Sequence, residues 1–359
     1  MSESEKLLSA RAYAKLNLTL QILYKRPDGY HEIESLVQRV DICDTVTARL
    51  LGPGEKDRVI CEPPVTLLGG EEENTAYKAL QALRLVLSEG GYRLGTVVGD
   101  EAEKPSIAER PSIEESFGAV EVKIEKRIPE GAGLGGASAD AASTLVLASR
   151  LWNLRPDLSL LARAASIVGS DVPVCLYGPL NIIRGRGERV IPLASLEPFW
   201  VIVAFPGKGI STADAYARWD SRHFAQYRSG IPARSVFERS KESDGSHDSK
   251  HFPGRSRDGE RRYINDAVNA ITDGDLRALG KALRNDFEEV AFESVPLAGD
   301  VKRGLMEAGA LGASLTGSGS AVFGLWATEE EARQALVVLR ERFAGDGVLL
   351  ILARSLSYR

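Results

Sequence analysis

The clearest hydrophobic pattern in the chain lies near its beginning. Residues 12–23 alternate between apolar and polar side chains, so that Ala14 and Leu16 face one way and Lys15 and Asn17 face the other. This period of two predicts a half-buried strand whose polar face carries both Lys15 and Asn17. Similar patterns predict strands at 35–51, 120–124, 200–205 and 347–353, a hairpin at 182–191, and a glycine turn that leads into a strand at 313–323.

Helical periodicity alternates irregularly with these strands and favours a mixed α+β protein. Helices are predicted at 74–89, 138–152, 158–168, 264–291, 298–308 and 329–343. A chain of 359 residues has room for about two domains. Two segments interrupt the pattern. The Glu-rich segment 95–118 is predicted to be a loop insertion, and 222–262, rich in Ser, Arg, Asp and Gly, a disordered insertion.

Composition narrows the class of protein only slightly. The hydrophobic and charged fractions of 43% and 26% are ordinary for a globular chain. A formal net charge of −5 argues against nucleic acid as the main partner. Three cysteines without a C-x-x-C spacing favour a reducing compartment, and no apolar stretch is long enough for a membrane span. We therefore expect a cytoplasmic protein.

A glycine-rich segment between a predicted strand and a predicted helix indicates an anion site. Residues 131–136 match G-x-G-x-x-G, and backbone N–H groups at a helix start attract anions. A dinucleotide site would need an acidic residue about 20 positions later at a strand end, whereas Asp157 lies in a turn between helices. Protein-kinase motifs are absent from the sequence, and Gly207-Lys208 is followed by Gly209 rather than Ser or Thr.

The longer segment 129–139, Pro-x-x-x-Gly-Leu-Gly-Gly-Ala-Ser-Ala, resembles the phosphate loop of the galactokinase, homoserine kinase, mevalonate kinase and phosphomevalonate kinase superfamily. The strand with Lys15 and the late glycine turn at 315–323 resemble the other two superfamily motifs, in the same order. Three flanking segments are more specific and resemble the 4-diphosphocytidyl-2-C-methyl-D-erythritol kinase family. They are Ala-Lys-Leu-Asn-Leu at 14–18, Arg-Pro-Asp-Gly-Tyr-His at 26–31 and Gly-Ser-Asp-Val-Pro at 169–173.

The resemblance covers most of the chain apart from the two insertions, and it implies a two-domain α+β kinase. It implies an N-terminal half at 1–205 that is like ribosomal protein S5 domain 2 and a ferredoxin-like half at 206–359, with the active cleft between them. ATP would be the co-substrate and would carry Mg²⁺. The acceptor would be a cytidine diphosphate sugar alcohol, phosphorylated on its 2-hydroxyl. We expect a monomer or homodimer, with neither nucleic acid nor a membrane as partner.

The resemblance also assigns residues. Asp171 would be the general base, and Lys15 would keep its carboxylate ionised and orient the acceptor hydroxyl. Ala137 and Ala139 replace a glycine and a serine of the common pattern, but the loop binds through backbone N–H groups, so we expect it to function. The nucleotide-binding residues implied are Pro129, Glu130, Gly131, Ala132, Gly133, Leu134, Gly135, Gly136, Ala137, Ser138 and Ala139.

The acceptor end is implied to combine a stacking surface with polar groups. Tyr30 offers a ring face, and His31 offers a donor or acceptor to a base edge. The full set of acceptor-binding residues implied is Asn17, Tyr30, His31, Thr212, Tyr216, Gly317 and Gly319. In the loop that carries Asp171, the proline that follows Val172 predicts an extended conformation for Val172.

Three other functions stay open. A related kinase could act on homoserine or a mevalonate, although Tyr30, His31 and the Asp171 loop argue against it. A catalytically silent binding protein should have lost Lys15, Asp171 or the glycine loop, and all three are present. A nucleic-acid module using 222–262 is disfavoured because that segment lacks interleaved aromatic residues.

Overall fold

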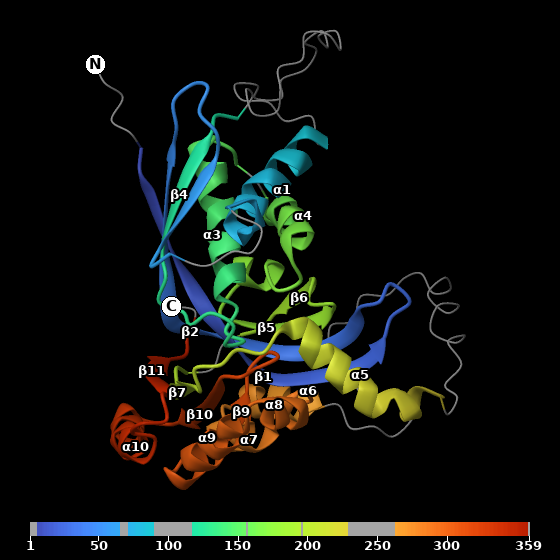
Figure 1. Ribbon diagram of the computed structural model, residues 1–359, viewed down its shortest axis with the longest axis vertical. Helices are drawn as coiled ribbons and strands as arrows, with labels where there is room; N and C mark the ends of the chain where they lie inside the picture. The colour runs from blue at the N-terminus through green and yellow to red at the C-terminus, as the bar shows by residue number, and fades with distance from the viewer. Residues whose placement is uncertain are drawn as a thin grey trace.

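The computed structural model describes residues 6–64, 71–89, 117–155, 157–194, 197–228 and 263–357 (Figure 1). Two β-sheets organise these ranges, one of seven strands and one of four. The larger sheet is built on a long antiparallel pair, β1 (Leu8–Lys25) and β2 (His31–Leu50). Its other strands are β3 (Arg58–Glu62), β4 (Val120–Glu125), β5 (Leu180–Gly185), β6 (Arg189–Pro192) and β8 (Arg284–Asn285).

A strand is confirmed at 12–23, but its predicted half-burial is wrong, because Lys15 and Asn17 on the polar face are only 3% and 1% exposed. Ala14, Leu16 and Leu18 are fully buried in β1, and the turn between β1 and β2 uses Gly29 at a φ of 86°. The helices α1 (Thr75–Glu89), α3 (Gly136–Leu151) and α4 (Leu158–Val168) cover one part of this sheet (Figure 1). Asp157 caps α4 by accepting a hydrogen bond from the Leu160 amide at 2.8 Å, which gives it a structural role.

The smaller sheet contains β7 (Trp200–Phe205), β9 (Ala313–Leu315), β10 (Val322–Trp326) and β11 (Leu349–Arg354), ordered β11-β7-β10-β9. The helices α9 (Pro296–Glu307) and α10 (Glu329–Arg342) pack against it. This connectivity is that of the expected ferredoxin-like half. Because β7 pairs with β10 and β11, the change of sheet falls before Trp200; the domain boundary at 205 stays a prediction.

The structure corrects the limits of both predicted insertions. Helix α5 (Thr212–Arg228) continues into the 222–262 segment, so disorder is wrong for 222–228, while 229–262 lie outside the described residues. Arg222 extends from this helix to Glu289, at 2.5 Å. Of 95–118, only Phe117 and Gly118 are described, and the Phe117 ring is buried in the core.

The predicted helical stretch 264–291 is divided into α6 (Tyr263–Thr272), α7 (Leu276–Ala282), strand β8 and α8 (Glu288–Ser294). Gly274, at a φ of 69°, ends the first helix, and the Asp275 side chain caps the second. Two short 3₁₀ turns, η1 (Glu71–Glu73) and η3 (Pro173–Leu176), complete the described elements. None of the helices within the described ranges has the length and apolar character needed to cross a bilayer.

The extended conformation predicted for Val172 is wrong. Its φ of −69° and ψ of −42° are helical, because Val172 begins the η3 turn and its carbonyl accepts a hydrogen bond from the Cys175 amide at 3.1 Å. A following proline disfavours this conformation without forbidding it. The buried Val172 side chain and the turn hydrogen bond outweigh that local preference. The result is a tight loop that presents Asp171 at its start.

Candidate active site

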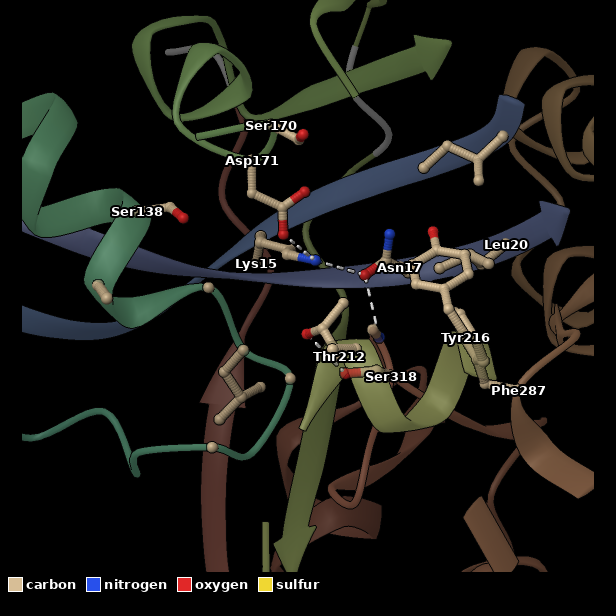
Figure 2. Close-up of a pocket in the computed structure, with 18 of the residues that line it drawn as sticks. Lys15, Asn17, Leu20, Ser138, Ser170, Asp171, Thr212, Tyr216, Phe287 and Ser318 are labelled. Carbon is tan, nitrogen blue, oxygen red and sulfur yellow. Dashed lines mark hydrogen bonds and ion pairs between the residues drawn. The ribbon is translucent and has the colours of Figure 1, made fainter. Parts of the chain in front are cut away.

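One pocket gathers most of the residues predicted to function. Its volume is about 950 Å³, within the range of small-molecule sites. Its lining comes from β1, the glycine loop before α3, the Asp171 loop, α5 and the late glycine turn (Figure 2). The pocket therefore draws on elements of both sheets, as the expected cleft requires.

Lys15 and Asp171 meet in this pocket. The Lys15 ammonium lies 3.1 Å from Asp171 Oδ2 and donates a hydrogen bond to Asn17 Oδ1 at 2.7 Å (Figure 2). The side chain of Lys15 is only 4% exposed, whereas that of Asp171 is 38% exposed. The pair therefore presents to the cavity a carboxylate that contacts a buried ammonium and is open to an incoming hydroxyl group.

The turn that follows Asp171 is buried and apolar, with Val172, Val174 and Cys175 in its interior. Cys175 donates a weak hydrogen bond to the Asp171 carbonyl oxygen at 3.4 Å, and its thiol is buried. Burial raises the pKa of Cys175 to about 12, so the thiol is neutral at physiological pH. Cys175 supports the backbone of Asp171 and adds no charge to the site.

Backbone contacts hold the glycine loop in place. A side chain at Gly135 would lie 2.9 Å from Lys15 Cγ, and one at Gly133 would lie 2.3 Å from the Thr316 carbonyl oxygen. Both glycines also have positive φ values, of 72° and 81°. The Lys15 amide donates to the Leu134 carbonyl oxygen at 2.9 Å, which ties the loop to β1.

The start of α3 is suited to an anion. Gly135 occupies its N-cap position and provides no side-chain cap, so the first N–H groups of the helix are left to a ligand. Residues 129–138 all line the pocket. Ala139 does not: it is a buried residue of α3 and is the one member of the predicted nucleotide set outside the lining.

The late glycine turn packs against this loop and against Asn17. The Gly317 amide donates to Asn17 Oδ1 at 3.1 Å, and Asn17 Nδ2 donates to Ser35 Oγ at 2.8 Å. Asn17 thus links Lys15 to the turn. Thr212 Oγ1 lies 3.2 Å from Ser318 Oγ at the pocket wall, whereas Gly319 is not part of the lining.

The other end of the pocket is aromatic. The His31 and Tyr216 rings are stacked, with centroids 4.4 Å apart. His31 Nε2 lies 2.7 Å from Asp220 Oδ1, and Lys25 Nζ lies 2.5 Å from Asp220 Oδ2. Burial acts to raise the pKa of Asp220, but Lys25 and His31 together hold it below its ordinary value. Because a carboxylate only accepts hydrogen bonds, Nε2 carries the hydrogen and Nδ1 is the acceptor of a neutral His31.

The two tyrosines at this end differ in exposure. Tyr30 is 52% exposed and lies beneath the Arg186 guanidinium, 4.5 Å from the ring centroid, so it is not a core aromatic. Tyr216 is half-buried, and its ring edge packs against Phe287. Burial, assisted by the Asp171 carboxylate, raises the pKa of Tyr216, which keeps its phenol protonated.

Several lining residues escaped the sequence analysis. Asp220 lies four residues after Tyr216 on α5, a spacing that places both on one helix face and could have revealed it. Lys25 directly precedes the 26–31 motif, and Arg186 lies in the glycine-flanked turn between β5 and β6. Lys126 is also in the lining, and no local pattern marks it.

This combination of a helix-start glycine loop, a lysine–aspartate pair and a ferredoxin-like second half defines a small-molecule kinase of the GHMP class. Residues 106–179 match the GHMP kinases N terminal domain, and 267–345 match the GHMP kinases C terminal domain. A homoserine kinase from Cytophaga hutchinsonii has the same fold, with a TM-score of 0.66, 18% identity and coverage of 99% of this chain and 96% of that chain.

Closer similarity is to one family within this class. A 4-diphosphocytidyl-2-C-methyl-D-erythritol kinase of Pelotomaculum thermopropionicum is 33% identical over 96% of this chain and 97% of its own length. One of Caldanaerobacter subterraneus subsp. tengcongensis is 32% identical over 91% of each chain. A crystal structure of a 4-(cytidine 5'-diphospho)-2C-methyl-D-erythritol kinase aligns with a TM-score of 0.62 and 27% identity, over 96% of this chain and 99% of that chain. The chain therefore belongs to the 4-diphosphocytidyl-2-C-methyl-D-erythritol kinase family of ATP-dependent kinases.

Proposed function

We propose that this protein transfers the γ-phosphoryl group of ATP to the 2-hydroxyl of 4-diphosphocytidyl-2-C-methyl-D-erythritol, a step in non-mevalonate isoprenoid synthesis. The observation that carries the proposal is the Lys15–Asp171 pair, which opens into the same pocket as the glycine loop. The names of the relatives supply the acceptor. The lining of the pocket supplies the independent support described below.

In the proposed mechanism, Asp171 accepts the proton of the acceptor hydroxyl as its oxygen attacks the γ-phosphorus. The bond from the γ-phosphorus to the β,γ-bridging oxygen breaks, and ADP leaves. Lys15, 3.1 Å from Asp171, orients the carboxylate toward the acceptor hydroxyl. The N–H groups at the start of α3 and its dipole stabilise the phosphates as charge shifts onto ADP.

The site suits a magnesium ion that is bound mainly by the phosphates of the nucleotide. No group of three or more His, Cys, Asp or Glu in the described ranges could hold a metal ion. Mg²⁺ commonly takes most of its oxygens from phosphates and water. The Ser138 hydroxyl lines the pocket on the phosphate loop and is the protein oxygen suited to join them. The ion would neutralise phosphate charge during transfer.

The aromatic end of the pocket suits a cytosine. His31 lines the pocket and uses Nε2 for its contact with Asp220, so Nδ1 is the ring nitrogen left for a ligand. In the tautomer with the hydrogen on Nε2, Nδ1 accepts a hydrogen bond, and cytosine carries an exocyclic amino donor. The exposed ring of Tyr30 provides a stacking face. Homoserine and mevalonate lack a base that could use these groups, which argues against the related kinases.

The experiment that tests the proposal is ATP consumption by the purified protein with three acceptors in parallel. They are 4-diphosphocytidyl-2-C-methyl-D-erythritol, homoserine and mevalonate. We expect turnover with the first compound alone. Turnover of another alcohol would keep the mechanism but overturn the acceptor, and ATP binding without any turnover would favour the catalytically silent protein.

A further inference from the structure

A second lysine of the pocket is held quite differently from Lys15. Lys126 follows β4 directly, and its side chain is 10% exposed. Its ammonium lies 2.5 Å from Asp44 Oδ2 and 2.7 Å from Asp140 Oδ2. Both carboxylates are buried, with side chains 0% and 4% exposed. We call Lys126, Asp44 and Asp140 the loop clamp, because its members join three segments around the phosphate loop.

Asp44 fixes the chain that enters the loop. Its Oδ1 accepts hydrogen bonds from the amides of Arg127, at 2.5 Å, and Ile128, at 2.8 Å. These residues directly precede the loop at Pro129. Asp44 itself belongs to β2, in the middle of the large sheet, so the entry to the loop is anchored to a rigid element.

Asp140 fixes the chain that leaves the loop. It lies in α3, whose first residue, Gly136, packs directly on the clamp. A side chain at Gly136 would lie 2.9 Å from Ile128 Cγ2 and 3.5 Å from Lys126 Nζ. The start of α3 therefore rests on Lys126, and the Lys126–Asp140 ion pair ties the helix to the segment anchored by Asp44.

One carboxylate of the loop clamp, that of Asp140, is buried with incomplete hydrogen bonding. Asp140 Oδ1 is buried and has no hydrogen-bond partner among the described residues. Burial raises the pKa of Asp140 to about 7 despite the attraction of Lys126, and the Asp44 carboxylate adds to the rise. A buried carboxylate that is so poorly satisfied is weak evidence for a stabilising role and calls for another explanation.

We propose that the loop clamp positions the phosphate loop for the nucleotide, with Lys126, Asp44 and Asp140 acting as positioning residues. Two carboxylates already neutralise the Lys126 charge, so it acts on ATP through the loop and the α3 N–H groups. Holding those groups in advance removes the cost of ordering them on binding. The inference rests on the proposed function for its ligand, ATP, but does not depend on the acceptor.

The test compares Asp140→Asn with a matched control, Asp57→Asn. Asp57 forms a similar buried ion pair with Arg84, at 2.7 Å with side chains 4% and 3% exposed, but it lies outside the pocket lining. Binding of a non-hydrolysable ATP analogue and of cytidine 5′-diphosphate is measured by calorimetry, together with melting temperature. We expect Asp140→Asn to weaken nucleotide binding about tenfold, or about 1.4 kcal/mol, and to leave cytidine diphosphate binding within about twofold.

Asp57→Asn should lower the melting temperature and leave both dissociation constants unchanged. Wild-type affinity for the ATP analogue in Asp140→Asn, or an equal loss in Asp57→Asn, would overturn the inference. If Asp140→Asn does not fold, Asp140→Ala takes its place, since it leaves a balanced Lys126–Asp44 pair. A wild type that binds the analogue but does not phosphorylate the cytidylyl acceptor would defeat the proposed function and leave this test readable.

Discussion

Two lysines, Lys15 and Lys126, line the same pocket, but they differ in the number and the burial of the carboxylates that they contact. Lys15 pairs with one carboxylate, Asp171, which is 38% exposed to the cavity. Lys126 pairs with two, Asp44 and Asp140, which are buried behind the phosphate loop. The first pair can meet a substrate atom directly. The carboxylates of the second pair are outside the lining and can influence the substrate only through Lys126 and the backbone that they hold.

In the proposed account, burial of the carboxylate, and not the presence of a lysine–aspartate pair, distinguishes a general base from a positioning residue. A general base must come within hydrogen-bond distance of the proton that it removes. Asp171 lines the cavity and is open to such a contact, whereas Asp140 and Asp44 are not among the lining residues. Each of the following experiments would break or sharpen this distinction.

The largest effects are expected from removing the two lysines in turn. Lys15→Met should reduce turnover about 10²-fold, the loss usual for a charged group that acts in the transition state. Its melting temperature should stay near that of wild type, because the exposed Asp171 carboxylate can be hydrated. Lys126→Met should instead destabilise the fold by about 3–5 kcal/mol, since it leaves two carboxylates buried without their cation.

Kinetics at saturating substrates and urea denaturation would measure these two results. If Lys126→Met folded with wild-type stability, or Lys15→Met kept full turnover, the distinction between the two pairs would be wrong.

A smaller effect is expected from crowding the phosphate loop. Gly133→Ala would place a methyl group 2.3 Å from the Thr316 carbonyl oxygen, and neither backbone can yield easily. Gly54→Ala is the matched control, because Gly54 has a similar φ of 83° and no atom within 4 Å. The control should be destabilised only by the strain of an alanine in the left-handed conformation, which is about 1–2 kcal/mol. Equal losses for both variants in urea denaturation would contradict the close packing of the two glycine turns.

The smallest effect is expected at the aromatic end. Tyr30→Ala should raise the KM of the cytidylyl acceptor about tenfold, in line with the loss of one stacking interaction. Because the ring is 52% exposed, stability should hardly change. Steady-state kinetics with ATP at saturation would measure this, and a fall in kcat with unchanged KM would argue against a binding role.

The sequence predicted those parts of the site that depend on residues close together in the chain. Strict alternation placed Lys15 and Asn17 on one face, and the 2.7 Å hydrogen bond between them confirms it. The glycine loop was predicted from its position between a strand and a helix. The tight loop at Asp171 was predicted in place but not in conformation, because tertiary packing of Val172 decides its backbone angles.

The rest depends on contacts between distant residues. Asp44 and Lys126 are 82 positions apart and meet only because β2 and β4 pair in one sheet. The polar composition after residue 222 predicted disorder, but α5 continues to Arg228. Arg222 on this helix forms an ion pair with Glu289 of α8, a contact between segments distant in sequence. The periodicity of hydrophobic residues along the chain does not reveal contacts between residues so far apart in sequence.

The most direct test of the account compares Asp171→Asn with Asp140→Asn in single-turnover transfer from ATP to 4-diphosphocytidyl-2-C-methyl-D-erythritol, with both substrates saturating. The account predicts that Asp171→Asn slows transfer by about 10² or more, as for the loss of a positioned base. Asp140→Asn, once its nucleotide site is filled, should transfer at a rate within a few-fold of wild type. Equal rates for the two variants, or wild-type transfer by Asp171→Asn, would contradict it.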